Sequence, residues 1–147
     1  MTAIGASVFS NCSKISSIPL SSGLLTIGNA AFQQCSNLKS ISIPNTVTSI
    51  GTSVFNACWS LRTITIPSTI PLGSGSSLFY ECRSLQSISL PSSSSAGSYQ
   101  FAMCKSLQSV TIPSDITIID SYCFRECSGL TQVILPSTIT EIKEGAF

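Results

Sequence analysis

The chain of 147 residues contains no histidine. Without an imidazole it cannot assemble the usual Ser-His-Asp or Cys-His arrangement of nucleophilic catalysis. It also lacks the Cys and His combination of common zinc sites, and its cysteines form no C-x-x-C pair. The sequence therefore argues against an enzyme and predicts neither a cofactor nor a metal site.

Charge is scarce as well. Charged residues make up 9% of the chain, against about 25% in ordinary soluble domains, and the formal net charge is +1. Such a chain has no basic surface for nucleic acid or for an anionic membrane. No run approaches the roughly 18 apolar residues of a spanning helix, and no signal peptide is visible. We expect neither nucleic-acid binding nor membrane insertion.

The sequence does contain one motif that is repeated six times. Phe is followed by Cys three residues later, then by an apolar stretch that usually ends in Pro. The Phe residues recur every 22 to 24 positions, at Phe9, Phe32, Phe55, Phe79, Phe101, Phe124 and Phe147. This period predicts a solenoid, in which one coil cannot bury its apolar face alone. We predict a single solenoid over residues 1–147, with about six 23-residue coils, and expect it to be a fragment of a longer array.

Each coil carries one strand pattern. Leu38, Ile41 and Ile43 show the period-2 alternation of a half-buried strand, and Pro44 closes it because proline has no N–H for a ladder. Stacked in register, these segments predict a mainly β fold with a parallel sheet of about six strands. Pro19 lies inside the first strand, where an edge position tolerates it. No helical periodicity is visible, so little α-helix is expected.

Two further features concern the backbone. Gly5, Gly28 and Gly51 occupy equivalent positions, which predicts a tight turn with a positive φ. The returns at residues 71–77 and 92–100 have lost their apolar pair, and we expect them to be the least rigid segments.

The periodic cysteines and phenylalanines are predicted to be core residues. Stacked coils would hold the thiols parallel, which suits small buried residues better than disulfides. The ladder consists of Cys12, Cys35, Cys58, Cys82, Cys104 and Cys127. Cys123 replaces a small core residue, and the Phe residues should form an internal spine. Four aromatic residues stand at variable positions and are candidates for exposure, namely Trp59, Tyr80, Tyr99 and Tyr122.

The combined motif L-x-x-I-x-I-P and V-x-x-I-G-x-x-x-F-x-x-C resembles the BspA-type, or Treponema-type, leucine-rich repeat over essentially the whole chain. This resemblance implies a right-handed leucine-rich coil with the parallel sheet on its concave face. It also implies a cell-surface or secreted protein of a bacterium or parasitic protist. Adhesion to host or extracellular-matrix proteins is the function that the family suggests.

The outward strand residues are the candidate binding surface. They are Lys39, Ser40, Ser42, Arg62, Thr63, Thr65, Gln86, Ser87, Ser89, Gln108, Ser109 and Thr111. Each hydroxyl could simply suit an exposed strand, but together they make a hydroxyl-rich face with one pair of cations. We predict a non-enzymatic module that binds a protein or glycan ligand through this face.

Two alternative functions remain at this stage. The chain could be a structural spacer in a longer surface array whose ligand binds elsewhere. Ice binding is suggested by Thr63 and Thr65, but the other coils lack this Thr pair and a curved sheet matches an ice plane poorly. The ends carry no polar capping repeat, so we also expect self-association through them.

Overall fold

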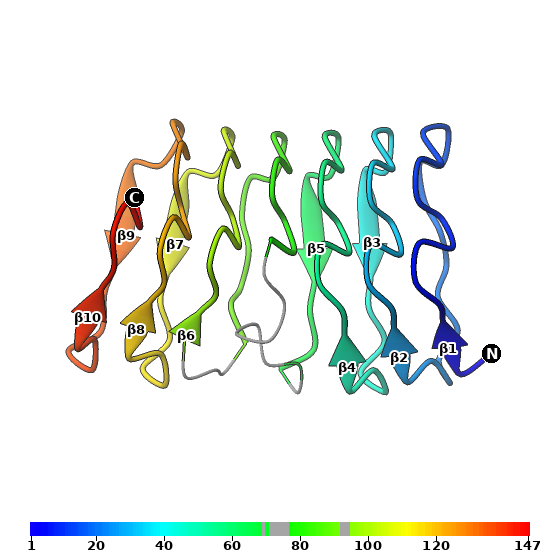
Figure 1. Cartoon of the computed structure of the whole chain (residues 1–147), viewed down its shortest axis with the longest axis horizontal. Coiled ribbons are helices and arrows are strands. Elements are labelled where there is room, and N and C mark those ends of the chain that lie inside the picture. The colour runs from blue at the N-terminus through cyan, green and yellow to red at the C-terminus, as the bar shows by residue number, and fades with distance from the viewer. Residues whose placement is uncertain (69, 71–76, 92–94) are drawn as a thin grey trace.

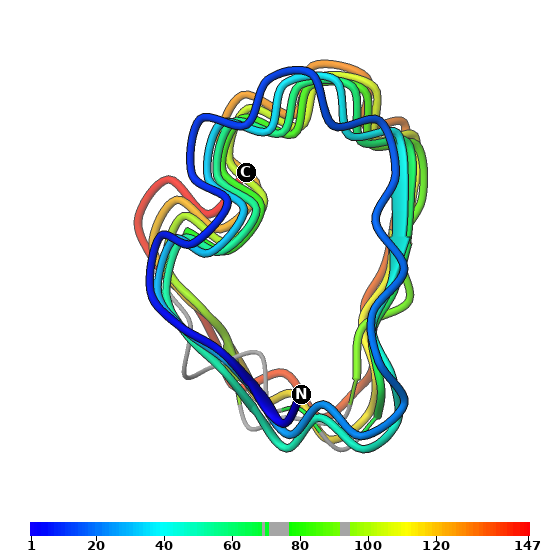
Figure 2. The same cartoon turned by 90° about the vertical axis from the view of Figure 1, so that its right-hand side faces the viewer.

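The computed structural model describes residues 1–68, 70, 77–91 and 95–147, and it shows coils stacked side by side along one axis (Figure 1). The prediction of loosened returns falls largely on residues outside this description, at 71–76 and 92–94. Viewed along the axis, the coils superpose closely (Figure 2). The chain runs clockwise as it recedes from its N-terminal end in that view, which is the right-handed sense.

Short parallel strands lie on two sides of the coils. One side carries β3 (Ser40–Ser42) paired with β5 (Thr63–Thr65), and β7 (Ser109–Thr111) paired with β9 (Gln132–Ile134). The other side carries β1 (Ala3–Ile4), β2 (Thr26–Ile27) and β4 (Ser49–Ile50), and then β6 (Ser95–Ala96), β8 (Ile118–Ile119) and β10 (Glu141–Ile142). The described residues include no helix. The predicted mainly β repeat solenoid is therefore confirmed.

The side with β3, β5, β7 and β9, which we call the strand face, differs in detail from the expected six-strand sheet. Its four strands form two separate pairs. The first coil has no strand here, and Pro19 lies within the segment where the strand was expected. The fourth coil has none at residues 86–90, and this interruption coincides with the 24- and 22-residue steps that flank Phe79.

The phenylalanine spine is confirmed. From Phe9 to Phe147 each ring stacks on the next, with centroids 5.2–5.7 Å apart and planes within 10° of parallel. The five inner rings, at Phe32, Phe55, Phe79, Phe101 and Phe124, are fully or almost fully buried. Aromatic side chains remove large apolar areas from water, so this spine binds each coil to its neighbours.

The cysteine ladder is buried too, apart from the partly exposed Cys12, and it has a hydrogen-bonding role that the sequence did not reveal. The Cys58 thiol donates to the carbonyl oxygen of Phe32, one coil earlier, at 3.1 Å. The same contact, at 3.1–3.3 Å, recurs for Cys35, Cys82, Cys104 and Cys127. Burial raises the pKa of the Cys58 thiol to about 12. The Cys58 thiol therefore stays protonated at neutral pH. All seven cysteines are free.

The prediction for the equivalent glycines is wrong. Gly28 and Gly51 do not have a positive φ. A Cβ added to Gly28 would lie 2.6 Å from the backbone nitrogen of Ala6, in the preceding coil. Glycine is therefore required because two coils approach closely, whereas the first coil's Gly5 has a nearest neighbour at 3.5 Å.

Positive φ angles occur instead at Gly145 and at non-glycine residues near the Phe and Cys positions. Six of them directly precede the ladder cysteines, namely Asn11, Gln34, Ala57, Glu81, Met103 and Glu126, with φ between 57° and 63°. Left-handed backbone costs an L-residue about 1–2 kcal/mol. The contacts between coils hold it in place. The Gln34 amide, for example, donates to the Asn56 carbonyl at 2.8 Å.

Candidate functional site

The strand face presents all twelve predicted site residues to solvent. Their register is that of the coils, with Ser40 beside Thr63 and Ser42 beside Thr65. Parallel strands lie about 4.8 Å apart, so equivalent side chains form closely spaced rows. The prediction that these residues share one outward face is thus confirmed as geometry, while a ligand for them remains a prediction.

One row of backbone hydrogen bonds links all six coils on this face. The amide of Lys39 donates to Ser16, that of Arg62 to Lys39, and that of Gln86 to Arg62, at 3.0–3.2 Å. Gln108 and Thr131 continue the row at 3.4 and 2.9 Å. The ladder therefore crosses the fourth coil even where the strands are interrupted. It fixes the spacing of the side chains that a ligand would meet.

The interruption leaves a hollow of about 430 Å³ between the fourth and fifth coils. Its rim is hydroxyl-bearing, with Ser87, Ser89, Ser109 and Thr111, and these are four of the predicted residues. Ile88, Leu90 and Pro113 complete the lining. Ile88 is only partly buried, whereas its counterparts Ile41 and Ile64 belong to the buried core. The hollow thus combines an apolar floor with a polar rim.

The two cations of the predicted set lie next to one another in the opposite half of the face. Lys39 and Arg62 are equivalent residues of adjacent coils, joined through their backbones at 3.0 Å, and both are exposed. At the far end of the face, Ile134 on β9 is 50% exposed. The face therefore carries hydroxyls along its length, with two cations in its second and third coils and an exposed isoleucine on β9.

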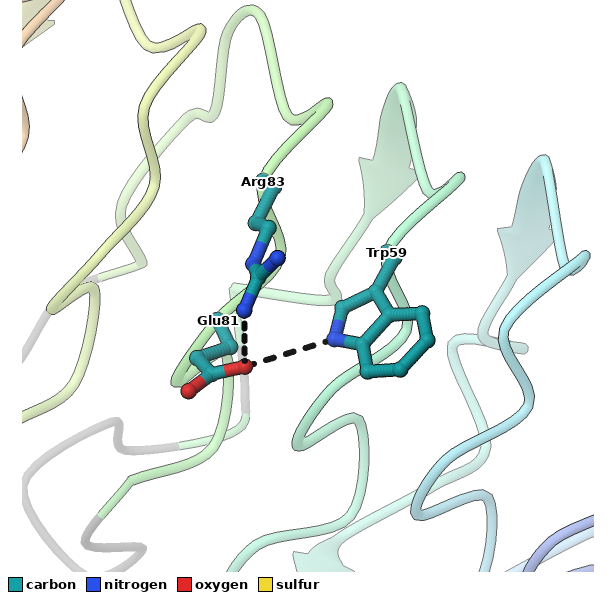
Figure 3. Close-up of polar contacts among 3 residues, drawn as sticks. All are labelled: Trp59, Glu81 and Arg83. Atoms are coloured by element: carbon teal, nitrogen blue, oxygen red, sulfur yellow. Dashed lines mark hydrogen bonds and ion pairs between the residues drawn. The ribbon is translucent and has the colours of Figure 1, made fainter.

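The turns around the ladder cysteines form a second surface, which we call the turn ridge. It consists of the residues directly before and directly after each ladder Cys. The predicted exposure of Trp59 is confirmed at 45%, and Figure 3 shows it beside two residues of the next coil, Glu81 and Arg83. The three candidate tyrosines are only partly exposed. Tyr99 stacks on Tyr122 at 4.9 Å and meets Tyr80 edge-on at 6.4 Å.

Sequence reasoning identified Trp59 but missed its partners. Trp59 and Arg83 each follow a ladder cysteine, and Glu81 precedes one, so the repeat alignment alone could have brought them together. Across the part of the chain that the structure describes, no three metal-ligating side chains cluster. Nor does any helix in that part have the length and apolarity to cross a bilayer.

Stacked parallel coils of about 23 residues, with buried Leu, Phe and Cys ladders, define a leucine-rich-repeat solenoid. The chain belongs to the BspA type leucine-rich repeat family, whose description matches six copies over residues 1–74 and 74–147. A comparison with curated proteins finds no match.

Solved structures agree with this assignment. A leucine-rich repeat protein of T. pallidum is 27% identical with a TM-score of 0.87, covering 96% of this chain and 66% of that one. One from Bacteroides ovatus is 30% identical with a TM-score of 0.74, covering 96% and 43%. A leucine-rich cell surface protein of Faecalibacterium prausnitzii is 27% identical with a TM-score of 0.60, covering 99% and 34%. The chain thus spans from one third to just under two thirds of these proteins.

Proposed function

We propose that this chain is a non-enzymatic binding module of a cell-surface or secreted protein, and that it recognises a protein partner through the strand face. The observation that carries the proposal is the hollow between the fourth and fifth coils, because it interrupts rows of evenly spaced hydroxyls with an apolar floor. Membership of the BspA type family and likeness to a leucine-rich cell surface protein support it.

The chemistry of the face favours a particular partner. Exchanging water for a ligand at a neutral hydroxyl gains only about 0.5–1.5 kcal/mol per hydrogen bond. Burying a partner's Leu or Phe against Ile88 and Leu90 would add about 1.5–3 kcal/mol. Lys39 and Arg62 would attract an acidic side chain. The best fit is therefore an extended protein segment with an apolar residue for the hollow and an acidic residue about two coils away.

The test is to fill the hollow. Ser109→Arg places a long side chain on its rim, and Ser49→Arg places the same side chain on β4 at the opposite side of the coils. Both serines are exposed strand residues, so the pair is matched. Binding to immobilised extracellular-matrix proteins, followed by biolayer interferometry, should fall at least tenfold for Ser109→Arg and stay unchanged for Ser49→Arg. Equal binding by both variants would refute the proposed face.

A spacer function remains the second candidate, because the solved relatives extend well beyond the stretch that matches this chain. A spacer should tolerate Ser109→Arg and Lys39→Glu together in a longer array without loss of binding. A binding module should not. The same interferometry assay, performed with the array in place of the isolated chain, separates the two functions.

A further inference from the structure

A second hollow, of about 320 Å³, lies on the turn ridge away from the strand face. It spans the first three coils and is lined by Asn11, Ser13, Gln34, Ser36, Ala57 and Trp59. The lining thus consists of two carboxamides, two hydroxyls, one methyl group and one indole, and it contains no ionised group. Each carboxamide and hydroxyl can both donate and accept a hydrogen bond.

The hollow arises because the third coil differs from the first two coils at two positions of the repeat. Ala57 occupies the position of Asn11 and Gln34, with nearly the same φ of 57° against 63° and 59°. Trp59 occupies the position of Ser13 and Ser36. The third coil therefore removes a long side chain from one row and adds a large ring to the other. The result is a gap with an aromatic wall and a polar rim.

The indole is held in place from the side of the fourth coil. Its Nε1–H donates to Glu81 Oε2 at 3.3 Å, and Arg83 donates to the same oxygen at 3.0 Å (Figure 3). The Arg83 guanidinium carbon also lies 5.3 Å from the centre of the indole ring. The orientation of Trp59 is thus set by its neighbours. A ligand packing against it loses less conformational entropy than it would on a mobile ring.

We propose that this hollow is a binding site for a neutral sugar, as a single ring or a disaccharide. The C–H face of a pyranose would pack against the indole, while its hydroxyls bond to Asn11, Gln34 and the two serines. Sugar hydroxyls also donate and accept, which matches the four polar side chains. The lining contains no cation that could bind an anionic sugar. The nearby Arg83 is already paired with Glu81. The volume of the site, about 320 Å³, lies near the lower end of the range for ligand pockets.

The test uses the intrinsic fluorescence of Trp59, which is the only tryptophan of the chain. Neutral probes are cellobiose, maltose, mannobiose and diacetylchitobiose, each titrated into the purified chain, with saturation-transfer NMR as a second measurement. For at least one probe we expect a saturable change in Trp59 fluorescence. In the NMR measurement we expect saturation transfer from the protein to the protons of that sugar's ring. Failure of all four probes overturns the proposal, and so does binding confined to sialyllactose or to a peptide.

Two variants locate the site. Ala57→Gln fills the gap with the side chain that the second coil already carries at this backbone conformation, and it should weaken probe binding at least tenfold while leaving the melting temperature near its original value. Trp59→Ala should weaken binding similarly in the NMR measurement. Ser49→Ala, at an exposed residue of β4 outside both hollows, is the control and should leave probe binding unchanged. Undiminished binding by Ala57→Gln would exclude this hollow, whatever the outcome for the strand face.

Discussion

Replacing Gln100 with leucine should stabilise the protein. Gln100 is completely buried, and neither its side-chain nitrogen nor its side-chain oxygen has a hydrogen-bond partner among the described residues. It directly precedes Phe101, in a row where the other coils place apolar residues. That row reads Val8, Ala31, Val54, Leu78, Gln100 and Cys123. Leu78, in the adjacent coil, shows that the row accommodates a leucine without exposure.

The size of the effect follows from the two unsatisfied atoms. A buried polar group without a partner costs about 1–3 kcal/mol, and an apolar side chain of similar size removes that cost. We therefore expect Gln100→Leu to raise the free energy of unfolding by about 2–3 kcal/mol. For a chain of this length, 1 kcal/mol corresponds to about 2–4 °C in melting temperature, so a rise of about 4–12 °C should be observed.

Urea denaturation followed by far-UV circular dichroism measures this change directly. The midpoint should rise while the slope stays constant, which shows that stability rather than compactness has changed. Leu78→Gln is the matched reverse variant and should destabilise by a comparable amount. If Gln100→Leu instead lowers the midpoint, the amide must be hydrogen-bonded in the folded protein, and the reasoning fails.

The remaining predictions concern the packing between coils. Gly28→Ala should destabilise by about 1–3 kcal/mol because the new methyl group meets backbone, whereas Gly5→Ala should be nearly neutral; thermal melting of both variants decides the point. Phe55→Ala should cost about 3–5 kcal/mol by opening the spine, measured in urea, and a cost below 1 kcal/mol would contradict the spine's role. The raised pKa of Cys58, about 12 against an ordinary 9.0, means that its contribution to stability is complete below pH 9 and is lost as the pH rises towards 12. Cys58→Ala should flatten the alkaline loss seen in melting curves, and an unchanged slope would contradict this. Phe147 is 49% exposed at one end of the stack, so the chain should self-associate at high concentration and Phe147→Ser should reduce the mass measured by light scattering; a monomeric parent chain would exclude this contact.

The periodic part of the fold could be predicted from the sequence because every coil repeats the same burial requirement. The Phe and Cys ladders are the clearest cases, since each residue recurs at a fixed interval and meets its own equivalent in the next coil. The outward position of Thr63 and Thr65 follows from the same alternation. Their exposure is confirmed, while their role in binding stays a prediction.

What escaped prediction depends on departures from the period. Gly28 is required because an added Cβ would lie 2.6 Å from the backbone nitrogen of Ala6. The sequence does not show this close approach of two coils, so the φ prediction, which was based on turn chemistry alone, failed. The strand face is interrupted in the fourth coil, where the spacing of the Phe residues is one longer before Phe79 and one shorter after it. The sequence does not show how the backbone accommodates these two changes. The bracing of Trp59 by Glu81 and Arg83 joins variable positions of two coils, for which a single sequence shows spacing but not contact.

The equivalence of the coils has a consequence for how such a molecule changes over generations. Phe9 and Phe147 stack on the spine in the same way, as do Phe32 and Phe124. Each coil therefore offers an equivalent ring contact to the coil beside it. Unequal recombination between two such points would lengthen or shorten the gene by whole coils while recreating the aromatic stack at the junction. The length of the solenoid can therefore evolve independently of the third and fourth coils, which carry Trp59 and its partners Glu81 and Arg83.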